Sequence, residues 1–531
     1  MDARQAVSAG KVWLGIEFGS TRIKAVLIGP DHRPIASGSH TWQDQLSDGV
    51  WTYSLDAVHA GLRDCYRDLK EQVREQYGKT LRKLSGMGVS AMMHGYLAFD
   101  ADMRQLVPFR TWRNTITGQA ATELTELLQF NIPQRWSAAH LHQAVLNGET
   151  HLNSLAFITT LAGYVHWMLS GEKVLGVGDA AGMFPINSER CDWDTAMLDK
   201  YQALIADRQF PWTVRGILPR VLCAGETAGS LTEAGARFLD PDGDLVPGVP
   251  MCPPEGDAGT GMAATNSVAP RTGNVSAGTS VFAMIVLEKP LRRLHTEIDM
   301  VTTPSGMPVA MVHYNTCTSD LNVWVGLLAE TARLFGSNAD MNEVYTKLFM
   351  EALRGDRDAG GLTGFNYYSG EPVTGTDEGV PMMTRRPDVP MNLPNFMRMH
   401  LMSALATLSI GMKTLTDEEQ VAIDSVLGHG GFFKTPEVGQ RILSAAIRCP
   451  VTVMETAGEG GAWGIALLAA YMTGRETGES LQDYLNSRVF VDAKAVTLQA
   501  APDEIEGFSE YLNRYERLIP AEKACSGALL S

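Results

Sequence analysis

The chain has 531 residues, with 44 Lys and Arg against 60 Asp and Glu, so its formal net charge is −16 when histidine is neutral. Its length allows roughly two to four domains. Its 45% apolar and 20% charged residues exclude a disordered or fibrous chain. The acidic balance, and the lack of a long Lys/Arg cluster in the sequence, argue against a nucleic-acid partner.

Cysteine spacing and hydropathy bear on the compartment. The seven cysteines are odd in number and widely spaced, and no Cys-x-x-Cys occurs, so neither a disulfide framework nor a zinc ribbon is indicated. The apolar run at 12–16 is too short, and is followed too soon by Glu17, to be a signal peptide. The longest apolar helical stretch, near 462–472, is well short of a membrane span. We therefore expect a cytoplasmic protein without a membrane partner.

The N-terminal half is predicted to begin with an antiparallel meander that is followed mostly by helices. Apolar or alternating runs predict strands, and apolar spacings of three or four predict helices. In chain order we expect strands at 12–16, 24–28 and 35–42, an amphipathic helix over 54–77, a strand at 84–90 and a mostly helical region over 119–169. The stretch 240–250, rich in Pro, Gly and Asp, indicates a loop.

The C-terminal half is predicted to repeat the strand–turn–strand unit of the N-terminal half. Residues 273–287 have the plan of the N-terminal meander, namely a strand, a Gly/Ser/Thr turn and an apolar strand. Further along we expect helices at 395–415 and 435–447, a strand at 451–455, a Gly-rich turn and an apolar helix from Ala462. The alternation of strands and helices predicts α/β layers, and the two hairpins indicate a duplicated α/β domain.

The first candidate site is the turn within residues 15–24. A turn rich in Gly, Ser and Thr between strands presents N–H groups and hydroxyls that form an anion site. Lys24 adds a point charge, and Glu17 could hold a hydrated cation beside a phosphate. An ordinary hairpin with a surface acid is the competing interpretation. The turn is not a P-loop, because the Gly-x-x-x-x-Gly-Lys-Ser/Thr spacing is missing.

The second candidate site combines residues 255–264 with 276–280. Small residues that can start a helix follow Asp257, so we expect Asp257 at a helix N-cap with its carboxylate held ionised by the helix dipole. A positioned carboxylate near a phosphate-binding hairpin is what phosphoryl transfer to a hydroxyl requires. A plain N-cap Asp is the commoner explanation of any single such residue, and the nearby hairpin favours the catalytic one.

The third candidate site is a pair of Gly-rich turns at 427–434 and 455–464. Glycines where a strand leads into a helix let a flat ring or a ribose lie against the backbone. A Gly-His-Gly-Gly run is weak evidence for a binding site by itself, because most such runs are ordinary loops. The three Gly-rich sites nevertheless follow one another in the same setting, each after an apolar strand.

Together these residues resemble the carbohydrate kinases named for their Phe-Gly-Gly-Tyr signature, in the superfamily of actin, hexokinase and the Hsp70 ATPase. The resemblance covers nearly the whole chain. Residues 15–21 are similar to that family's first phosphate hairpin, and 255–259 with 276–280 to its catalytic Asp and second phosphate hairpin. Residues 428–431 are similar to the adenosine loop, 459–466 to its C-terminal partner, and 365–372 to the aromatic Gly-Glu-x-x-Pro segment.

On the sugar side, residues 90–95 resemble the Ser-x-Gln-Met-His-Gly loop of xylulose kinases. Met93 and His94 are therefore expected to contact the sugar, with the thioether over a C–H face and the imidazole on a hydroxyl. A lone His94 would otherwise be read as a structural histidine. Residues 111–114, with Trp112 and Asn114, resemble the Trp-x-Asp segment that borders the same pocket.

The resemblance implies two actin-like (ribonuclease H-like) α/β domains, at 1–265 and 266–531, with a central cleft for nucleotide and sugar. Asp257 would be the catalytic base and would align the sugar hydroxyl, and Glu17 and Asp257 would hold Mg²⁺. The expected partner is a small sugar or polyol, a ketopentose of the xylulose or ribulose type being the first choice; the oligomeric state is open, a homodimer included. The residues expected to bind ATP are Gly19, Ser20, Thr21, Lys24, Gly278, Thr279, Ser280, Gly430, Gly431, Glu459 and Gly460.

Departures from the family pattern concern mainly the sugar side. Glu17 stands where the family usually has Asp, Met92 replaces Gln, and Asn114 replaces Asp. Residues 160–164 resemble the Lys-Asp-Tyr segment but lack its Asp. These changes leave the identity of the sugar open, while the residues expected to handle the phosphoryl group are retained.

Two alternatives keep the fold, namely an ATPase that drives a partner and a non-catalytic sugar sensor. Met92, Asn114 and Gly163 slightly favour the first, whereas Met93, His94 and Asp257 speak against it. A nucleotide-binding dehydrogenase needs Gly-x-Gly-x-x-Gly opening a helix. Residues 256–261 have the wrong spacing for that motif.

Overall fold

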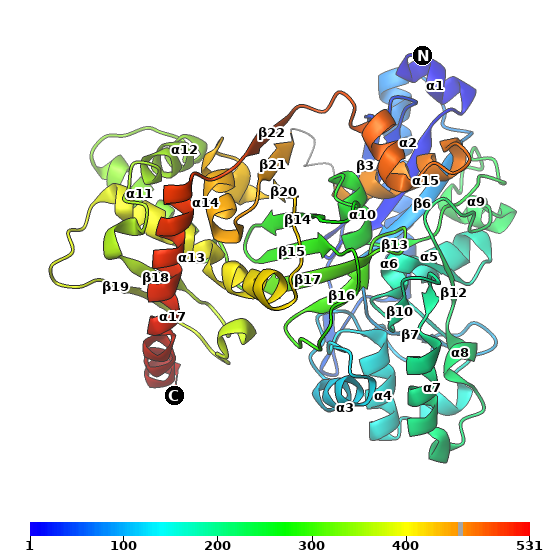
Figure 1. Ribbon diagram of the computed structural model, residues 1–531. Helices are drawn as coiled ribbons and strands as arrows, with labels where there is room; N and C mark the ends of the chain where they lie inside the picture. Colours follow the sequence, from blue (N-terminus) through cyan, green and yellow to red (C-terminus); the bar gives the residue numbers. More distant parts are fainter. Residues whose placement is uncertain (455–459, 531) are drawn as a thin grey trace. The chain divides into compact units, whose positions relative to one another are not determined.

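The computed structural model describes residues 1–454 and 460–530, and they form two compact units. Unit 1 contains residues 1–269, 294–309 and 459–492, and unit 2 contains 270–293, 310–458 and 493–531. The units are thus interleaved along the chain: helix α15 (Gly460–Gly474), from the last fifth of the sequence, packs on strands from the N-terminus (Figure 1). The predicted domains, 1–265 and 266–531, stay a prediction.

The central sheet of unit 1 confirms the predicted meander. Its strand order is β13-β6-β1-β2-β3. Strand β1 pairs antiparallel with β2, and β2 with β3, whereas β1 and β13 both run parallel to β6. These strands are β1 (Trp13–Phe18), β2 (Arg22–Ile28), β3 (Pro34–Thr41), β6 (Gly86–Ala91) and β13 (Glu255–Gly256).

Helices of unit 1 cover this sheet through small residues and an apolar stripe. Helix α2 (Leu55–Tyr77), close to its predicted bounds, begins after the N-cap Ser54, ends at Gly78 with φ 63°, and packs on β2 and β3. Helix α15 packs on β1 so closely that a Cβ added at Gly15 would lie 2.0 Å from the carbonyl oxygen of Ala462. Only glycine in β1 permits this distance.

The other elements of unit 1 surround that core. The region 119–169, predicted mostly helical, forms α3, α4 and α5, with the short strand β8 before α5. The remaining helices are α1 (Ala3–Ala9), α3 (Gly118–Leu128), α4 (Ser137–Asn147), α5 (Leu161–Ser170), α6 (Val177–Ala180), α7 (Thr195–Leu204), α8 (Val214–Ile217), α9 (Glu233–Leu239), α10 (Asp257–Ala264) and α16 (Leu481–Tyr484). The remaining strands are β4 (Gln45–Ser47), β5 (Val50–Thr52), β7 (Leu97–Phe99), β8 (Phe157–Thr159), β9 (Val174–Gly176), β10 (Ile186–Asn187), β11 (Asp192–Trp193), β12 (Arg220–Leu222) and β16 (Asp299–Thr302).

Unit 2 is built around a second hairpin, as predicted. The strands of unit 2 follow the order β17-β15-β14-β20-β21-β22 in the sheet, with β14 antiparallel to β15 and parallel to β20. The strands are β14 (Thr272–Ala277), β15 (Val281–Val286), β17 (Pro308–Tyr314), β20 (Ser425–His429), β21 (Val451–Met454) and β22 (Ala495–Leu498), with β18 (Thr363–Asn366) and β19 (Pro381–Thr384) forming a separate pair. The helices are α11 (Ser319–Leu334), α12 (Met341–Ala352), α13 (Leu393–Lys413), α14 (Val438–Ile447) and α17 (Pro502–Leu530).

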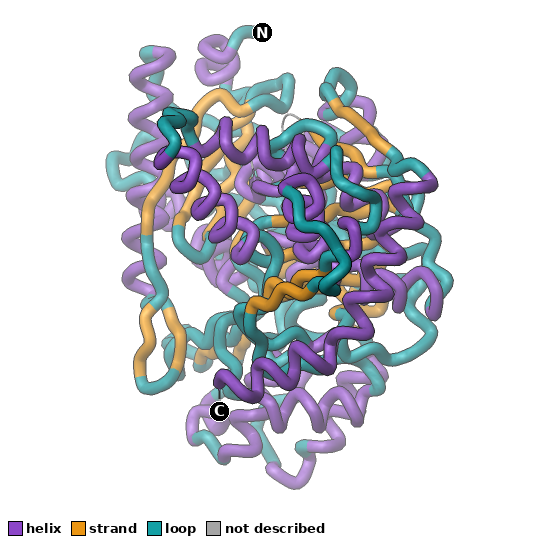
Figure 2. The backbone as a smooth tube through the Cα atoms, turned by 90° about the vertical axis from the view of Figure 1, so that its left-hand side faces the viewer, coloured by secondary structure: helices purple, strands orange, loops and turns teal. Residues whose placement is uncertain are grey.

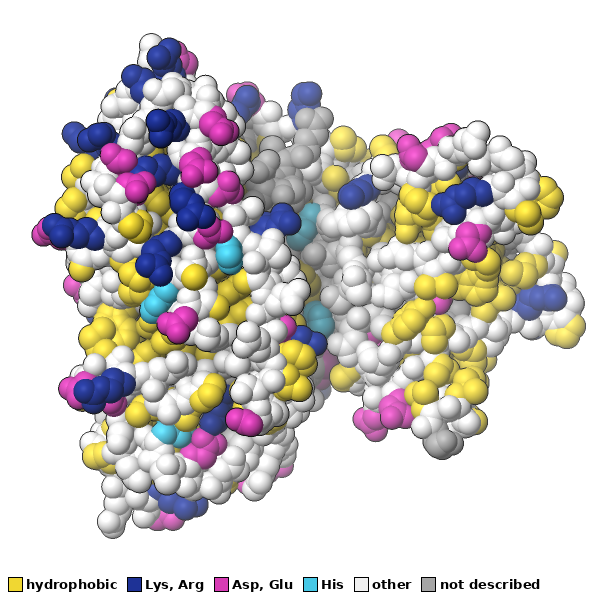
Figure 3. All heavy atoms as spheres, turned by 180° about the vertical axis from the view of Figure 1, so that it is seen from behind, with side chains coloured by type: hydrophobic (Ala, Val, Ile, Leu, Met, Phe, Trp, Pro, Cys, Tyr) yellow, Lys and Arg dark blue, Asp and Glu magenta, His cyan; other side chains and the backbone are white. Residues whose placement is uncertain are grey.

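Helices and strands are interspersed along the backbone, as expected of an α/β protein (Figure 2). On the face drawn in Figure 3, basic and acidic side chains lie among one another, and the described residues form no continuous basic stripe there. Among the described helices, none combines the length and the apolar character that a membrane crossing needs.

Candidate active site

One edge of the unit 1 sheet gathers the candidate residues. Strands β1, β6 and β13 are parallel, with Glu17 opposite Ser90 and Glu255 also opposite Ser90 in register. The carboxyl ends of the three strands therefore meet at one edge, which is where open α/β sheets bind ligands. The segments that follow them contain Gly19, Met93 with His94, and Asp257.

Asp257 lies at the junction of β13 and α10. Its Oδ1 accepts hydrogen bonds from the backbone N–H of Met93 (3.2 Å) and of Ala258 (3.0 Å). The carboxyl retains contact with solvent, yet the protein atoms around it raise its pKa by desolvation, against the effect of these hydrogen bonds. The side chain is thus accessible and held in one orientation.

One sequence-based expectation about Asp257 is wrong. The N-cap of α10 is Gly256, and Asp257 is the first helical residue, because the chain leaves the strand conformation one position earlier than predicted. The helix dipole was expected to favour the ionised carboxylate; desolvation acts in the opposite direction and raises the pKa of Asp257.

Glu17 and Lys24 face one another across the first hairpin. They are paired in register between β1 and β2, and Glu17 accepts a hydrogen bond from the N–H of Ala462 at 3.2 Å. Burial and the charge of Asp257 raise the pKa of Glu17, and the positive charge of Lys24 opposes this rise. The two carboxyl groups predicted to hold a cation are therefore electrostatic neighbours.

The turn of this hairpin is exposed, and two aromatic side chains hold it by hydrogen bonds to its backbone. Ser20 and Thr21 are exposed, and the Gly19 N–H donates to the carbonyl of Arg22 at 3.0 Å. Trp42 donates through Nε1 to the carbonyl of Gly19 (2.7 Å), and Tyr53 donates to that of Ser20 (2.6 Å). These two aromatic residues were missed by sequence reasoning, because only the folded meander brings them under the turn.

Gly460 belongs to the same group of residues. A Cβ added there would lie 3.9 Å from both Glu17 Oε2 and Lys24 Nζ, and one added at Gly461 would lie 2.3 Å from Glu17 Oε1. The start of α15 therefore approaches Glu17 as backbone alone. Glu459, also predicted to bind ATP, lies outside the described residues.

His94 combines a structural contact with a free acceptor. Its Nδ1 lies 3.0 Å from the carbonyl of Gly182, and its ring stacks on Trp136 with centroids 6.2 Å apart. Burial, and the charge of Arg135, lower the pKa of His94 to about 3. The neutral ring donates from Nδ1 to the carbonyl, so Nε2 carries the lone pair. Nδ1 of His94 therefore has a structural role, while Nε2 is available to accept a hydrogen bond from a ligand.

The other predicted sugar residues are arranged differently. Met93 lies over Gly256, where an added Cβ would be 2.1 Å from Met93 Cγ. Asn114 is buried and uses its whole amide on backbone: Oδ1 accepts from Trp51 N–H (2.8 Å), and Nδ2 donates to the carbonyls of Trp51 and Thr111. Asn114 therefore fixes its loop, while Trp112 is 42% exposed.

Two buried acids behind Asp257 were missed by sequence reasoning. Asp179 Oδ2 accepts from the Thr160 hydroxyl at 2.6 Å, and Oδ1 has no hydrogen-bond partner among the described residues. Glu255 accepts from the N–H groups of Gly178 (3.3 Å) and Asp179 (2.9 Å). Desolvation raises the pKa of Asp179 to about 7 and that of Glu255 to about 8, and each is raised further by a neighbouring acid.

These raised pKa values predict a pH-dependent stability. A carboxyl whose pKa is higher in the folded state than in the unfolded one stabilises the fold at low pH, and this stability is lost as pH rises through the folded pKa. We expect unit 1 to lose stability between about pH 4 and pH 8, and the dependence to be shallower in Asp179→Asn. Thermal unfolding of both proteins across this range checks it, and equal slopes would contradict the assignment.

Unit 2 has a corresponding turn between β14 and β15, and a close backbone contact at a glycine lies next to it. The carbonyl of Gly278 accepts from the N–H and the hydroxyl of Thr318, and that of Thr279 from the Cys317 N–H. Gly430 follows β20 with φ 101°, and a Cβ added there would lie 2.4 Å from the carbonyl oxygen of Ala277. The predicted nucleotide residues 278–280 and 430–431 thus share one edge of the unit 2 sheet.

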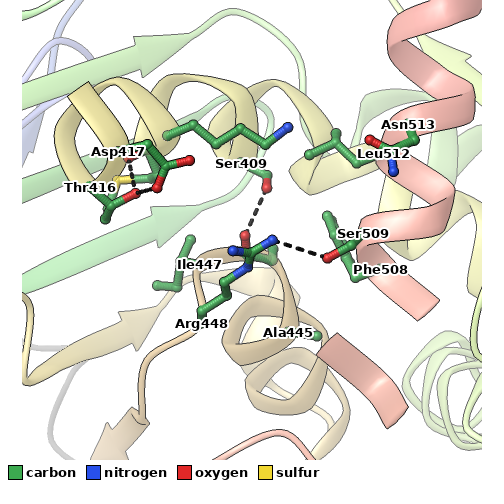
Figure 4. Close-up of a pocket in the computed structure, with 13 residues that line it drawn as sticks. Ser409, Thr416, Asp417, Ala445, Ile447, Arg448, Phe508, Ser509, Leu512 and Asn513 are labelled. Carbon is green, nitrogen blue, oxygen red and sulfur yellow. Dashed lines mark hydrogen bonds between the residues drawn. The ribbon is translucent and has the colours of Figure 1, made fainter. Parts of the chain in front are cut away.

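A cavity of about 120 Å³ lies elsewhere in unit 2, between α13, α14 and α17 (Figure 4). Its polar groups bond to one another: Ser409 donates to the carbonyl of Ala446 at 2.7 Å, and Arg448 donates to Ser509 at 3.3 Å. None of the predicted site residues lines it.

Comparison with known proteins shows the family. The N-terminal domain of the FGGY family of carbohydrate kinases matches residues 12–252, and its C-terminal domain matches 273–473. The chain therefore belongs to the FGGY family of carbohydrate kinases, whose members are ATP-dependent phosphotransferases. The predicted family and enzyme class are confirmed.

Individual relatives are distant in sequence. The chain is 22% identical to the xylulose kinase of Escherichia coli (strain K12) over 309 residues, which span 54% of this chain and 57% of that protein. It resembles the structures of a xyloylose kinase from Brucella ovis (TM-score 0.78, 18% identity, 97% of this chain and 100% of that one) and of gluconate kinase from Lactobacillus acidophilus (TM-score 0.78, 15% identity, 97% and 99%). These structures confirm the predicted fold class.

Proposed function

We propose that this protein transfers the γ-phosphoryl group of ATP to a hydroxyl of a small carbohydrate, with a ketopentose of the xylulose or ribulose type as the first choice. The observation that most directly supports this proposal is the edge of the unit 1 sheet, where Asp257, Glu17 and the Met93–His94 segment lie together. Support for the substrate class comes from the names of the relatives, which include xylulose and gluconate kinases.

The acceptor hydroxyl would be bound by three kinds of contact. His94 Nε2 accepts a hydrogen bond from a hydroxyl, and Met93 covers a C–H face of the sugar. Asp257, oriented by two backbone N–H groups, takes the proton of the attacking hydroxyl. A loose phosphoryl transition state asks little of the base, so orientation supplies much of the rate.

The phosphates would be bound by the two exposed turns, through the hydroxyls and N–H groups of 20–21 and 279–280. Gly430 and Gly431 would leave room for the adenosine against backbone. Lys24, paired with Glu17 across the hairpin, adds positive charge at the first turn.

Mg²⁺ fits the same edge. It is commonly bound by one or two carboxylates together with substrate phosphates and water. The charge of Asp257 adds to the effect of burial in raising the pKa of Glu17, so the two carboxyl groups interact. The described residues contain no cluster of three metal ligands, so Glu17 and Asp257 would hold the ion with the phosphates. When bound, Mg²⁺ neutralises charge on the transferring phosphoryl group.

A coupled kinase assay over ketoses, aldoses, aldonic acids and polyols tests the proposal. We expect ATP consumption to be strongly stimulated by a ketopentose. Consumption that no sugar stimulates would favour the partner-driving ATPase, and calorimetric sugar binding without turnover would favour a sensor. Stimulation by another class alone would keep the kinase and replace the substrate.

Glu17→Asp is expected to retain phosphoryl transfer but to shift the Mg²⁺ requirement severalfold. The shorter side chain changes the distance from the carboxylate to an ion at the sheet edge. Activity titrated against Mg²⁺ at fixed ATP measures the shift, with Asp44→Glu, a change at a surface ion pair, as the control. An unchanged titration would place Glu17 away from the ion.

A further inference from the structure

Two cysteines of unit 1 lie side by side although they are distant in the sequence. Cys191 ends the turn of the β10–β11 hairpin, with φ 48°, and Cys223 directly follows β12. Both are partly exposed, whereas Cys65, Cys252, Cys317 and Cys449 are buried. Neither belongs to the residues assigned above to phosphoryl transfer.

The two sulfur atoms share one neighbour. A Cβ added at Gly306 would lie 2.4 Å from Cys191 Sγ and 3.8 Å from Cys223 Sγ. Cys191 Sγ also lies 3.8 Å from the carbonyl of Ser305. Because both sulfur atoms lie within 4 Å of one position, only a short movement of the side chains separates them from bonding distance, and this arrangement suits a disulfide.

The surroundings make the two thiols unequal. The interaction with Cys223 lowers the pKa of Cys191, whereas the same interaction and burial raise the pKa of Cys223. The lowered pKa favours the thiolate of Cys191, and the thiolate is the form that reacts with oxidants. Cys223 remains a thiol beside it.

We propose that Cys191 and Cys223 form a redox-active dithiol, a modification site that hydrogen peroxide oxidises to an intramolecular disulfide. The Cys191 sulfur attacks one peroxide oxygen, the O–O bond breaks, and after proton transfer water leaves and a sulfenic acid remains. The Cys223 sulfur then attacks the sulfenic sulfur, the S–O bond breaks, and a second water leaves. Two thiols and one peroxide thus give one disulfide and two waters; a dithiol reductant reverses the step.

The disulfide would lie near the segment that packs against α10, the helix that begins at Asp257. Ala224, next to Cys223, donates its N–H to the carbonyl of Pro304 at 2.7 Å, and a Cβ added at Gly259 of α10 would lie 3.3 Å from Pro304. The crosslink would therefore tie together two segments that both contact residues 304–305, and Pro304 lies against α10.

The experiment treats the full-length protein with hydrogen peroxide and maps its peptides without reduction by mass spectrometry. We expect a Cys191–Cys223 crosslink that has lost two hydrogen atoms, disappears with dithiothreitol, and raises the unfolding midpoint by about 5 °C. Cys223→Ser should instead accumulate a dimedone-reactive sulfenic acid at Cys191. In the reduced protein, iodoacetamide at pH 7 should modify Cys191 about tenfold faster than Cys525.

Cys525 is the matched control, since it is also partly exposed and belongs to no pair described here. Cys525→Ser should leave the crosslink and its midpoint shift unchanged. The proposal is overturned if peroxide gives no Cys191–Cys223 crosslink in the wild type, or if Cys191 and Cys525 are alkylated at the same rate. Both readouts use the folded wild-type protein, so an unstable variant does not decide the result.

Discussion

Asp257→Ala is expected to lower the turnover number by about 10² or more while leaving nucleotide affinity nearly intact. The carboxyl Oδ1 is oriented by the N–H groups of Met93 and Ala258, so its proton-accepting oxygen has a fixed place at the sheet edge. The residues proposed to bind the nucleotide, in the two turns and the Gly-rich segments together with Lys24, do not include Asp257. A coupled assay gives kcat, and calorimetry with ADP gives Kd.

Asp257→Asn is the matched control, because it preserves shape and hydrogen-bond geometry but removes the basic oxygen. It should lose activity to a similar extent, which separates the missing base from a missing side chain. In the wild type, the raised pKa of Asp257 predicts that kcat falls as pH falls through that pKa, since a protonated carboxyl accepts no proton. A loss of ADP affinity equal to the loss of kcat would contradict the assigned role.

The fold followed from local patterns where those patterns were strong. Strand alternation, the Gly-Ser-Thr turns and the stripe of α2 predicted β1 to β3, α2 and the second hairpin within a few residues. The interleaving of the units did not follow, because helix α15 is apolar on all sides and its sequence does not say which sheet it covers. Gly15 and Gly461 mark that contact only once the partner backbone is known.

Motifs allowed Asp257, Glu17 and Met93 to be proposed from the sequence, and the structure places all three at one edge of the unit 1 sheet. The supporting residues could not be proposed in this way, because they act through tertiary contacts. Trp42 and Tyr53 brace the first turn from later segments of the chain. Asp179 was detectable in principle, as an acid among small residues after a short apolar strand, yet its meaning depends on Thr160 and on the neighbouring acids.

Gly464→Ala is expected to destabilise unit 1 by roughly 3 kcal/mol through overpacking. An added Cβ would lie 2.0 Å from the carbonyl oxygen of Thr260 and 3.1 Å from its Cα, and both are backbone atoms that no rotamer change can move. Thr260 belongs to α10, whose first residue is Asp257, so separating α15 from α10 should also lower kcat. Thermal unfolding and the coupled assay measure the two effects.

Gly261→Ala provides the comparison within the same pair of helices. No atom lies within 4 Å of a Cβ added at Gly261, so the substitution should only reduce backbone freedom in the unfolded chain and stabilise α10 by up to about 1 kcal/mol. The two alanines should therefore move the unfolding midpoint in opposite directions. If both variants raise it, α15 and α10 are not held together by backbone contact at Gly464, and the support inferred for Asp257 from that side is wrong.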